Sequence, residues 1–157
     1  MTSGALEAGL DSPLGPLCLV ASAGAPVALD WRKTSRRDAD PALRVGLAWL
    51  AAYFARSPLP AQPSLAPSGP SYCQAVWQVM QQIPYGRTLS YGTVARRLAL
   101  DPRVVGQACG ANPLPLLVPC HRIVGADGLG GYSGAGGVAA KRFLLRHEGA
   151  LPPDLFA

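Results

Sequence analysis

The segment Pro119-Cys120-His121-Arg122 places a thiol beside an imidazole and a guanidinium group. It follows a short apolar run and precedes a segment rich in glycine. A cysteine acts as a nucleophile in its thiolate form, which a neighbouring imidazole or cation favours. An isolated Cys-His pair more often belongs to a packed core, because free cysteine behaves as a small apolar residue. Cys120 is therefore a candidate nucleophile that needs support from other residues.

Activation of Cys120 by His121 meets a geometric difficulty. Successive side chains of a regular strand point to opposite faces, so adjacent residues of a strand do not touch. A backbone turn after Pro119, or a water molecule between imidazole and thiol, would remove the difficulty. A base is better held when a third group orients it, and Glu148 is the best candidate for that group. The alternative is that Glu148 is an ordinary solvated acid at a helix end.

Two short helices are predicted before the cysteine. Ser90 is a good N-cap for a helix up to residue 98, and Asp101-Pro102 is a typical start for a second helix over residues 102–111. A connection of about three residues is typical of a helix-turn-helix, although many such pairs are simply packed helices. In the DNA-binding interpretation, Arg103 meets phosphates or enters the base stack, and Gly106 helps to thin the surface of the second helix. In the alternative, Arg103 is a solvated surface residue and the small residues mark tight packing.

The N-terminal part is predicted to form a small domain over residues 1–57. Residues 17–22 and 26–31 have the pattern of a hairpin, and Asp40-Pro41 is predicted to start a helix that ends near residue 56. Residues 57–70 contain five prolines, three serines and a glycine, so residues 58–70 are predicted to be a linker. A domain of this size buries little surface alone.

The C-terminal part, residues 71–157, is predicted to form a second, mainly helical domain. Helices are expected over residues 71–82 and 138–147, and the glycine-rich residues 125–137 are expected to form a loop. Residues 116–118 are expected to be a short buried extended run. The predicted fold class is therefore α+β, with a small sheet and helix followed by a helical domain with a winged-helix-like helix-turn-helix.

Composition limits the classes of partner. The 157 residues carry a net charge of +5, and from Tyr72 onward eight Lys or Arg face four acids, against six and five before it. The C-terminal part is therefore the one expected to attract a polyanion. Four widely spaced cysteines and two histidines have no metal-ligand spacing, so neither a metal nor a disulfide is expected. The absence of a signal peptide or a long apolar run indicates a cytoplasmic protein that does not act at a membrane.

Taken together, these residues resemble the O6-alkylguanine-DNA alkyltransferase family over Tyr72 to Gly149, about half of the chain. Order and spacing both agree, and the Pro-Cys-His-Arg core is highly specific in that setting. The matching stretches are Ala75-Val76-Trp77, Ile83-Pro84-Tyr85-Gly86-Arg87, Ser90-Tyr91, Arg103-Val104-Val105-Gly106, Asn112-Pro113, Val118-Pro119-Cys120-His121-Arg122, Gly131-Tyr132-Ser133-Gly134 and His147-Glu148-Gly149. The N-terminal part resembles the family's variable domain only loosely.

The resemblance implies a single-turnover methyltransferase that removes an alkyl group from O6-alkylguanine in double-stranded DNA. Cys120 would accept the alkyl group, and His121 would act as the base through a water molecule. Glu148 would hold the tautomer of His121, and Asn112 would tie the recognition helix to the active-site segment. No cofactor is implied, and a monomer is expected.

The resemblance also implies which residues deliver and hold the damaged base. The nucleotide must leave the duplex, because the alkyl carbon lies on a base edge inside it. Tyr91 would donate to the guanine ring, and Arg103 would fill the gap left in the stack. Pro115, Tyr132 and Ser133 would line the pocket.

Two departures from the family pattern stand out. Tyr72-Cys73 replaces the usual Phe-Gln, and Ser133-Gly134-Ala135-Gly136-Gly137 is longer by about two residues than the usual Ser-Gly-Gly. The extra length falls on the pocket, so the range of alkyl groups accepted is left open.

Two other functions are considered. The first is a damage-binding protein without transfer, but the presence of Cys120 is evidence against it. The second is a cysteine hydrolase that uses Cys120, His121 and Glu148.

Overall fold

The structure is a computed structural model that describes residues 4–126, 128–132, 134 and 136–151. Its contacts divide the chain into two compact units. The first comprises Met1–Ser68 with Pro113–Leu117, and the second comprises Gly69–Asn112 with Val118–Ala157. In the part of the chain that the structure describes, no helix has the length and apolar character needed to cross a membrane.

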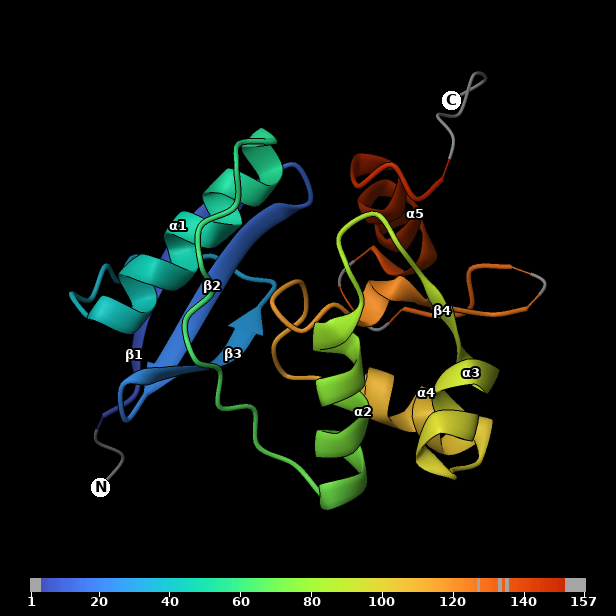
Figure 1. The fold of residues 1–157 in the computed structure, drawn as a ribbon. Helices are drawn as coiled ribbons and strands as arrows, with labels where there is room; N and C mark the ends of the chain where they lie inside the picture. Colours follow the sequence, from blue (N-terminus) through green and yellow to red (C-terminus); the bar gives the residue numbers. More distant parts are fainter. Residues whose placement is uncertain (1–3, 127, 133, 135, 152–157) are drawn as a thin grey trace. The chain divides into compact units, whose positions relative to one another are not determined.

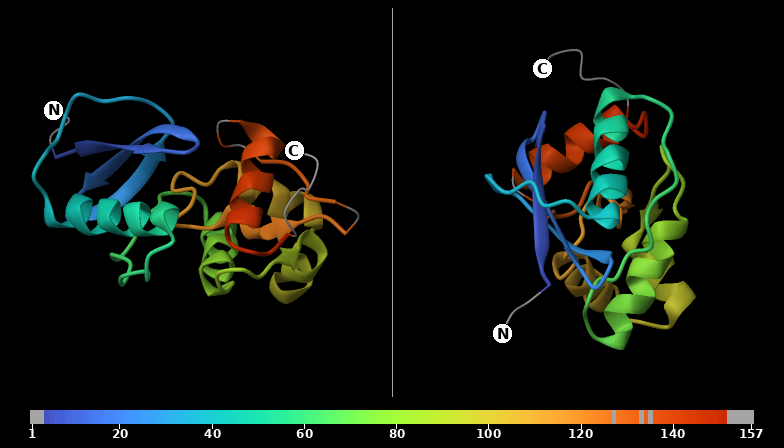
Figure 2. Two further views of the ribbon diagram at one scale, coloured as in Figure 1. Left: turned by 90° about the horizontal axis from the view of Figure 1, so that it is seen from above. Right: turned by 90° about the vertical axis from the view of Figure 1, so that its left-hand side faces the viewer.

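The first unit is a three-stranded antiparallel sheet with one helix packed on it (Figure 1). Its strands are β1 (Leu6–Ser12), β2 (Gly15–Ser22) and β3 (Ala25–Asp30), in the order β1-β2-β3. The helix α1 (Pro41–Ala55) begins at Asp40, whose side chain accepts from the amide of Ala42. A second view shows α1 lying along one face of the sheet (Figure 2). The predicted hairpin and helix are confirmed, whereas β1 was not expected.

The contact between α1 and the sheet depends on a small residue. A Cβ atom added to Gly46 would lie 2.5 Å from Cδ2 of Leu19 in β2, so glycine lets the helix approach the strand. Leu17 and Leu19 of β2 and Leu43 and Leu50 of α1 are almost fully buried. These leucines supply much of the apolar area that stabilises this unit.

Two segments that the sequence places near the domain boundary belong to the first unit. The amide of Ala66 donates to the carbonyl of Pro26 at 2.9 Å, and the amide of Leu29 donates to the carbonyl of Pro113 at 2.8 Å. These backbone hydrogen bonds join part of the proline-rich segment, and the segment Pro113–Leu117, to β3. The boundaries at residues 57 and 70 stay a prediction.

The second unit is mainly helical. Its helices are α2 (Ser71–Gln82), α3 (Tyr91–Leu98), α4 (Pro102–Gly110) and α5 (Gly137–His147), with a short 3-10 helix, η1 (Cys120–Arg122). Two short strands, β4 (Leu89–Ser90) and β5 (Ile123–Val124), pair in parallel. The helices agree with the sequence prediction to within one residue at their ends. The predicted fold class, α+β, is confirmed, while the comparison with a winged helix stays a prediction.

Local capping fixes the pair α3 and α4. Ser90 accepts from the amide of Thr93, and Asp101 accepts from the amide of Arg103, so each helix begins at a side-chain cap. Ala99 ends α3 with a left-handed backbone, φ 54°, and three residues join the helices. Trp77 of α2 is buried and its Nε1–H donates to the carbonyl of Ala108 at 2.9 Å, which joins α2 to α4.

One backbone prediction is wrong. Residues 116–118 are fully buried, as expected, but they do not form an extended run. Leu116 has φ 73°, and the amide of Leu117 donates to the carbonyl of Pro115 at 2.9 Å, so the chain turns there. An apolar run between prolines predicts burial better than it predicts backbone shape, because burial depends on side chains and the turn depends on the neighbouring prolines.

Candidate active site

The second unit contains a cavity of about 360 Å³ at Cys120. It lies at the lower end of the range, roughly 300–1,000 Å³, that is common for small-molecule sites. Helix α3 contributes Tyr91, η1 contributes Cys120, α4 contributes small residues, and the glycine-rich segment contributes Tyr132. The residues that line it are Tyr91, Gly106, Cys109, Gly110, Cys120, Gly131 and Tyr132.

Cys120 begins η1, so the backbone does turn after Pro119, which is one of the two ways, with a bridging water, in which His121 could act on the thiol. Cys120 is 4% exposed. Burial raises its pKa, while a hydrogen bond from Asn112, the charge of Lys141 and nearby backbone amides act in the opposite direction. The resting group is therefore a shielded thiol whose thiolate has several nearby stabilising groups.

His121, Glu148 and Arg122 form a buried cluster beside η1. His121 Nε2 lies 2.6 Å from Oε2 of Glu148, and Nε of Arg122 donates to Oε1 at 2.9 Å. Burial alone would raise the pKa of Glu148, but hydrogen bonds from His121 and Arg122 lower it to about 2. Glu148 is thus ionised at neutral pH. The alternative of a solvated helix-end acid does not hold, since its side chain is fully buried.

The charge of Glu148 decides the tautomer of His121. A carboxylate only accepts hydrogen bonds, so Nε2 of His121 carries the hydrogen and donates it. Nδ1 then carries a lone pair, and among the described residues this buried atom has no hydrogen-bond partner. Burial lowers the pKa of His121, which keeps the ring neutral at neutral pH. A neutral imidazole with a free lone pair has the form that a general base needs.

Asn112 links the end of α4 to the segment before Cys120. Its Nδ2 donates to the carbonyl of Val118 at 2.8 Å, and the amide of Cys120 donates to the same carbonyl, also at 2.8 Å. The connection predicted for Asn112, between the recognition helix and the active-site segment, corresponds to this side-chain hydrogen bond. It also orients the first turn of η1, because one carbonyl holds both groups.

Tyr91 and Tyr132 place two hydroxyl-bearing rings at the cavity. Burial raises the pKa of Tyr91 to about 12 and that of Tyr132 well above its ordinary value, so both remain protonated at neutral pH. The hydroxyl of Tyr132 has no hydrogen-bond partner among the described residues. Both rings can therefore offer an O–H donor to a ligand in the cavity.

Helix α4 carries the remaining predicted DNA contacts. The side chain of Arg103 is 89% exposed and pairs with Asp101 at 3.4 Å, whereas Gly106 lines the cavity.

The other residues predicted for the pocket are not placed at the cavity. Pro115 belongs to the first unit and is not among the residues that line the cavity. Ser133 lies outside the described residues. In the part that is described, no cluster of three or more His, Cys, Asp or Glu side chains could hold a metal ion.

A comparison with known protein families gives a match to the C-terminal half of the chain. Residues 71–150 match the family model described as "6-O-methylguanine DNA methyltransferase, DNA binding domain", which spans half of the chain. The chain belongs to the 6-O-methylguanine DNA methyltransferase family. The resemblance drawn from the sequence motifs is therefore confirmed, and so is the class of enzyme.

Individual relatives of this methyltransferase agree with the family assignment. A protein of Methanosarcina acetivorans named "Methylated-DNA--protein-cysteine methyltransferase" is 34% identical over 151 residues, covering 89% of this chain and 96% of that protein. A Thermus thermophilus protein named "DNA base-flipping protein" is 52% identical over 77 residues, covering 48% and 51%. The crystal structure of Mycobacterium tuberculosis OGT in complex with DNA has TM-score 0.78 and 37% identity, covering 90% of this chain and 91% of that one.

Two residues at this methyltransferase site were not predicted. Lys141 is fully buried, and its Nζ donates to the carbonyls of Ile123 at 2.7 Å and Gly131 at 3.0 Å. The spacing could have indicated it, because Lys141 lies three and four residues before buried Leu144 and Leu145 on one face of α5. Cys109 lines the cavity, one residue after buried Ala108. Its position was visible in the helix pattern, but its nearness to Cys120 depends on the fold.

Proposed function

We propose that this chain repairs DNA by transferring an alkyl group from O6-alkylguanine to Sγ of Cys120, once per protein molecule. The observation that carries the proposal is a cysteine at a cavity large enough for a base, with a carboxylate-held neutral imidazole as the next residue. The motif spacing, the matching DNA binding domain and the named relatives all support it.

The nucleophile is generated by proton transfer from Cys120 to Nδ1 of His121. Adjacent residues of η1 favour a water molecule as the carrier of this proton, as the sequence analysis expected. Glu148 stabilises the imidazolium that forms, because its carboxylate already accepts from Nε2. Lys141 stabilises the thiolate by its charge.

The alkyl carbon then forms a bond to sulfur while its bond to O6 of guanine breaks. The departing base takes the electron pair of the C–O bond, so it needs a proton or a hydrogen bond as it leaves. Tyr91 supplies this donor, since it lines the cavity and remains protonated. Tyr132 is a second donor on the same cavity. The product is a thioether at Cys120, a bond that water does not cleave under these conditions, so each molecule acts once.

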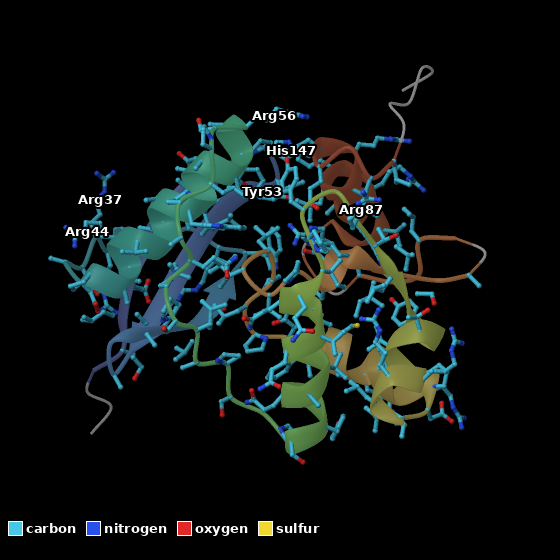
Figure 3. The ribbon with its side chains drawn as sticks, in the orientation of Figure 1. Arg37, Arg44, Tyr53, Arg56, Arg87 and His147 are labelled. Atoms are coloured by element: carbon cyan, nitrogen blue, oxygen red, sulfur yellow. The ribbon has the colours of Figure 1, made fainter. Side chains whose placement is uncertain are left out.

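The macromolecular partner is DNA, in keeping with the family domain and with the DNA-bound relative. The base must leave the duplex to reach a buried thiol. Arg103 enters the stack or contacts phosphates from the start of α4, and the small residue Gly106 lets that helix approach the groove. Arg96 and Arg97 in the last turn of α3 are exposed, and Arg87 lies in the loop between α2 and β4 (Figure 3).

Intact-mass measurement tests the proposal directly. The protein is incubated with a duplex that contains one O6-methylguanine and is then weighed. We expect a stoichiometric gain of one methylene group, located at Cys120 by peptide mapping. The variant Cys120→Ala should bind the duplex with similar affinity and gain no mass. A wild-type protein that binds the damaged duplex and keeps its mass would overturn the proposal.

That same outcome would favour a second function, damage binding without transfer. The observation behind this alternative is the 52% identity with the protein named "DNA base-flipping protein" over 77 residues. Cys120 is the residue that separates the two functions in this chain, because binding alone needs no nucleophile. A base-flipping protein would show damage-dependent affinity and fluorescence of an extruded base analogue, with no change in mass.

A further inference from the structure

The cavity at Cys120 holds a second thiol that the proposed reaction does not use. Cys109 lies next to the last residue of α4 and lines the same cavity as Cys120. Of the four cysteines, the other two are at Cys18, in β2, and Cys73, in α2, and neither lines this cavity. A pair of thiols at one cavity has redox chemistry that a single thiol lacks.

Asn112 holds the two cysteine-bearing segments together. Its backbone amide donates to the carbonyl of Cys109 at 3.3 Å, and its side chain donates to the carbonyl of Val118 at 2.8 Å. The amide of Cys120 donates to that same carbonyl. The side-chain hydrogen bond of Asn112 therefore joins the end of α4 to the segment before η1, and the two backbone bonds fix the local turn on either side of it. Cys109 stands where the helix ends, so a small backbone adjustment there breaks few helical hydrogen bonds.

The charge of Lys141 acts on both thiols. Lys141 is buried, bonds to two carbonyls, and lies 5.6 Å from the centre of the Tyr91 ring at the cavity. Burial raises the pKa of Cys109 to about 12 and also raises that of Cys120, whereas the charge of Lys141 lowers both. Either thiolate is thus stabilised by the charge of the same ammonium group, while the shared cavity separates this pair of thiols from Cys18 and Cys73.

We propose that Cys109 and Cys120 form a reversible disulfide that shuts off the alkyl acceptor under oxidising conditions and protects it from irreversible oxidation. This inference adds regulation to the proposed alkyl transfer and rests on it for its biological meaning. The formation of the disulfide itself is a separate chemical claim.

The oxidant is a peroxide, and the reaction balances in two steps. The Cys120 thiolate attacks one oxygen of hydrogen peroxide, which forms an S–O bond, breaks the O–O bond and releases hydroxide. The sulfur of Cys109 then attacks the sulfenic sulfur of Cys120, and the hydroxyl group leaves as water with the proton of Cys109. Two thiols are oxidised and one peroxide is reduced to two waters. Without Cys109, further peroxide converts the sulfenic acid to the sulfinic acid, which thiol reductants do not reverse.

The test compares wild type, Cys109→Ser and the control Cys73→Ser, which removes a buried thiol that does not line the cavity. Each reduced protein is treated with hydrogen peroxide until its mass stops changing, then divided, with one half reduced by dithiothreitol. Both halves are weighed, mapped as non-reduced peptides and assayed with the methylated duplex. Peptide masses do not depend on DNA, so a failure of alkyl transfer and a failure of the disulfide are read separately.

We expect wild type and Cys73→Ser to lose two hydrogen atoms, to yield a linked Cys109–Cys120 peptide, and to regain transfer after reduction. Cys109→Ser should instead gain oxygen at Cys120 and stay inactive after reduction. The inference is overturned if wild type gains oxygen at Cys120 as the variant does, or if Cys120 links to Cys18, Cys73 or a second chain. Linkage of Cys109 to Cys120 with no methyl transfer by reduced protein would retain the disulfide and refute the proposed function.

Discussion

Replacing Glu148 by glutamine tests the buried cluster that holds His121. The amide has nearly the shape of the carboxylate but no charge, so it leaves the guanidinium of Arg122 buried without its counterion. Arg122 is 7% exposed, and it would keep the carbonyl of Ile83 as a partner at 2.8 Å. Glu148 also accepts from the amide of Gly86 at 3.1 Å, a bond that glutamine can retain. The substitution therefore removes charge with little loss of packing.

The expected loss of stability follows from two separate arguments. The pKa of Glu148 falls from 4.5 to about 2 in the folded protein. A shift of this size corresponds to about 3 kcal/mol in favour of the folded state at neutral pH. Removing one partner of a buried ion pair costs roughly 3–5 kcal/mol. We expect the free energy of unfolding of Glu148→Gln to be lower by about 3 kcal/mol at neutral pH, by either argument.

The stability difference between wild type and Glu148→Gln should depend on pH, in a direction set by the lowered pKa of Glu148. Because the folded-state pKa is depressed, the contribution of Glu148 is fully present above its ordinary pKa and is lost as the pH falls towards the folded-state value of about 2. The difference between wild type and Glu148→Gln should therefore shrink by about 1 kcal/mol between neutral pH and about pH 3.5. Urea unfolding at both pH values measures it. A difference that stays constant over this range would refute the assigned ionisation of Glu148.

The same variant tests the role of the cluster in catalysis. Without the carboxylate, the Nε2–H tautomer of His121 loses its support, so the rate of methyl transfer should fall roughly a hundredfold or more. Glu7→Gln is the matched control, because Glu7 also pairs with arginines but belongs to the first unit. Its single-turnover transfer rate should equal that of wild type. Equal rates in both variants would contradict the proposed function of Glu148.

Three further substitutions test other parts of the site. Lys141→Met removes the buried cation, so the pKa of the acceptor thiol should rise. The pH–rate profile of single-turnover transfer should then move to higher pH. An unmoved profile would exclude electrostatic stabilisation of the thiolate by Lys141. Gly130→Ala would place a Cβ atom 2.7 Å from the ring of Tyr91 at φ +75°, so transfer should slow, whereas Gly128→Ala meets open space and should transfer like wild type. Arg103→Ala changes an 89% exposed side chain, so the free energy of unfolding should be unaffected. The affinity for DNA should fall, and the slope of its salt dependence should decrease by about one. Fluorescence anisotropy at several salt concentrations measures both, and an unchanged affinity would show that Arg103 is not part of the DNA interface.

The sequence predicted the helices better than the sheets, for a physical reason. Asp40, Ser90 and Asp101 each mark a helix start through a hydrogen bond to an amide two or three residues away, so the signal is local. By contrast, β1 contains Glu, Gly and Asp and has no β-branched residue, and β4 and β5 have two residues each. Such strands exist because a distant strand pairs with them, and no local pattern contains that information.

The same distinction applies to the site. His121 was a candidate because it follows Cys120, and Glu148 because it is an acid at the end of the last helix. The resemblance to a family then implied a role for each of them. The alternation of side chains on a strand left either a backbone turn or a bridging water open, and η1 supplies the turn. The position of Cys109 at the cavity, and of Lys141 against the Tyr91 ring and the carbonyl of Gly131, follow from the packing of the fold. A buried lysine and a small thiol look like ordinary helix residues until the fold brings them beside the acceptor.

The directions of the pKa shifts of Cys120 and His121 describe the resting state of the proposed site. Burial raises the pKa of the thiol and lowers that of the imidazole, so a proton on sulfur is favoured over a proton on His121 in the resting protein. A thiolate–imidazolium pair is thus disfavoured in the resting protein, so the proton transfer that generates the nucleophile adds to the barrier of the reaction. The fixed charges of Glu148 and Lys141 favour that transfer, because one stabilises the imidazolium and the other the thiolate. A nucleophile used once gains from this arrangement, since it stays protonated in the resting protein.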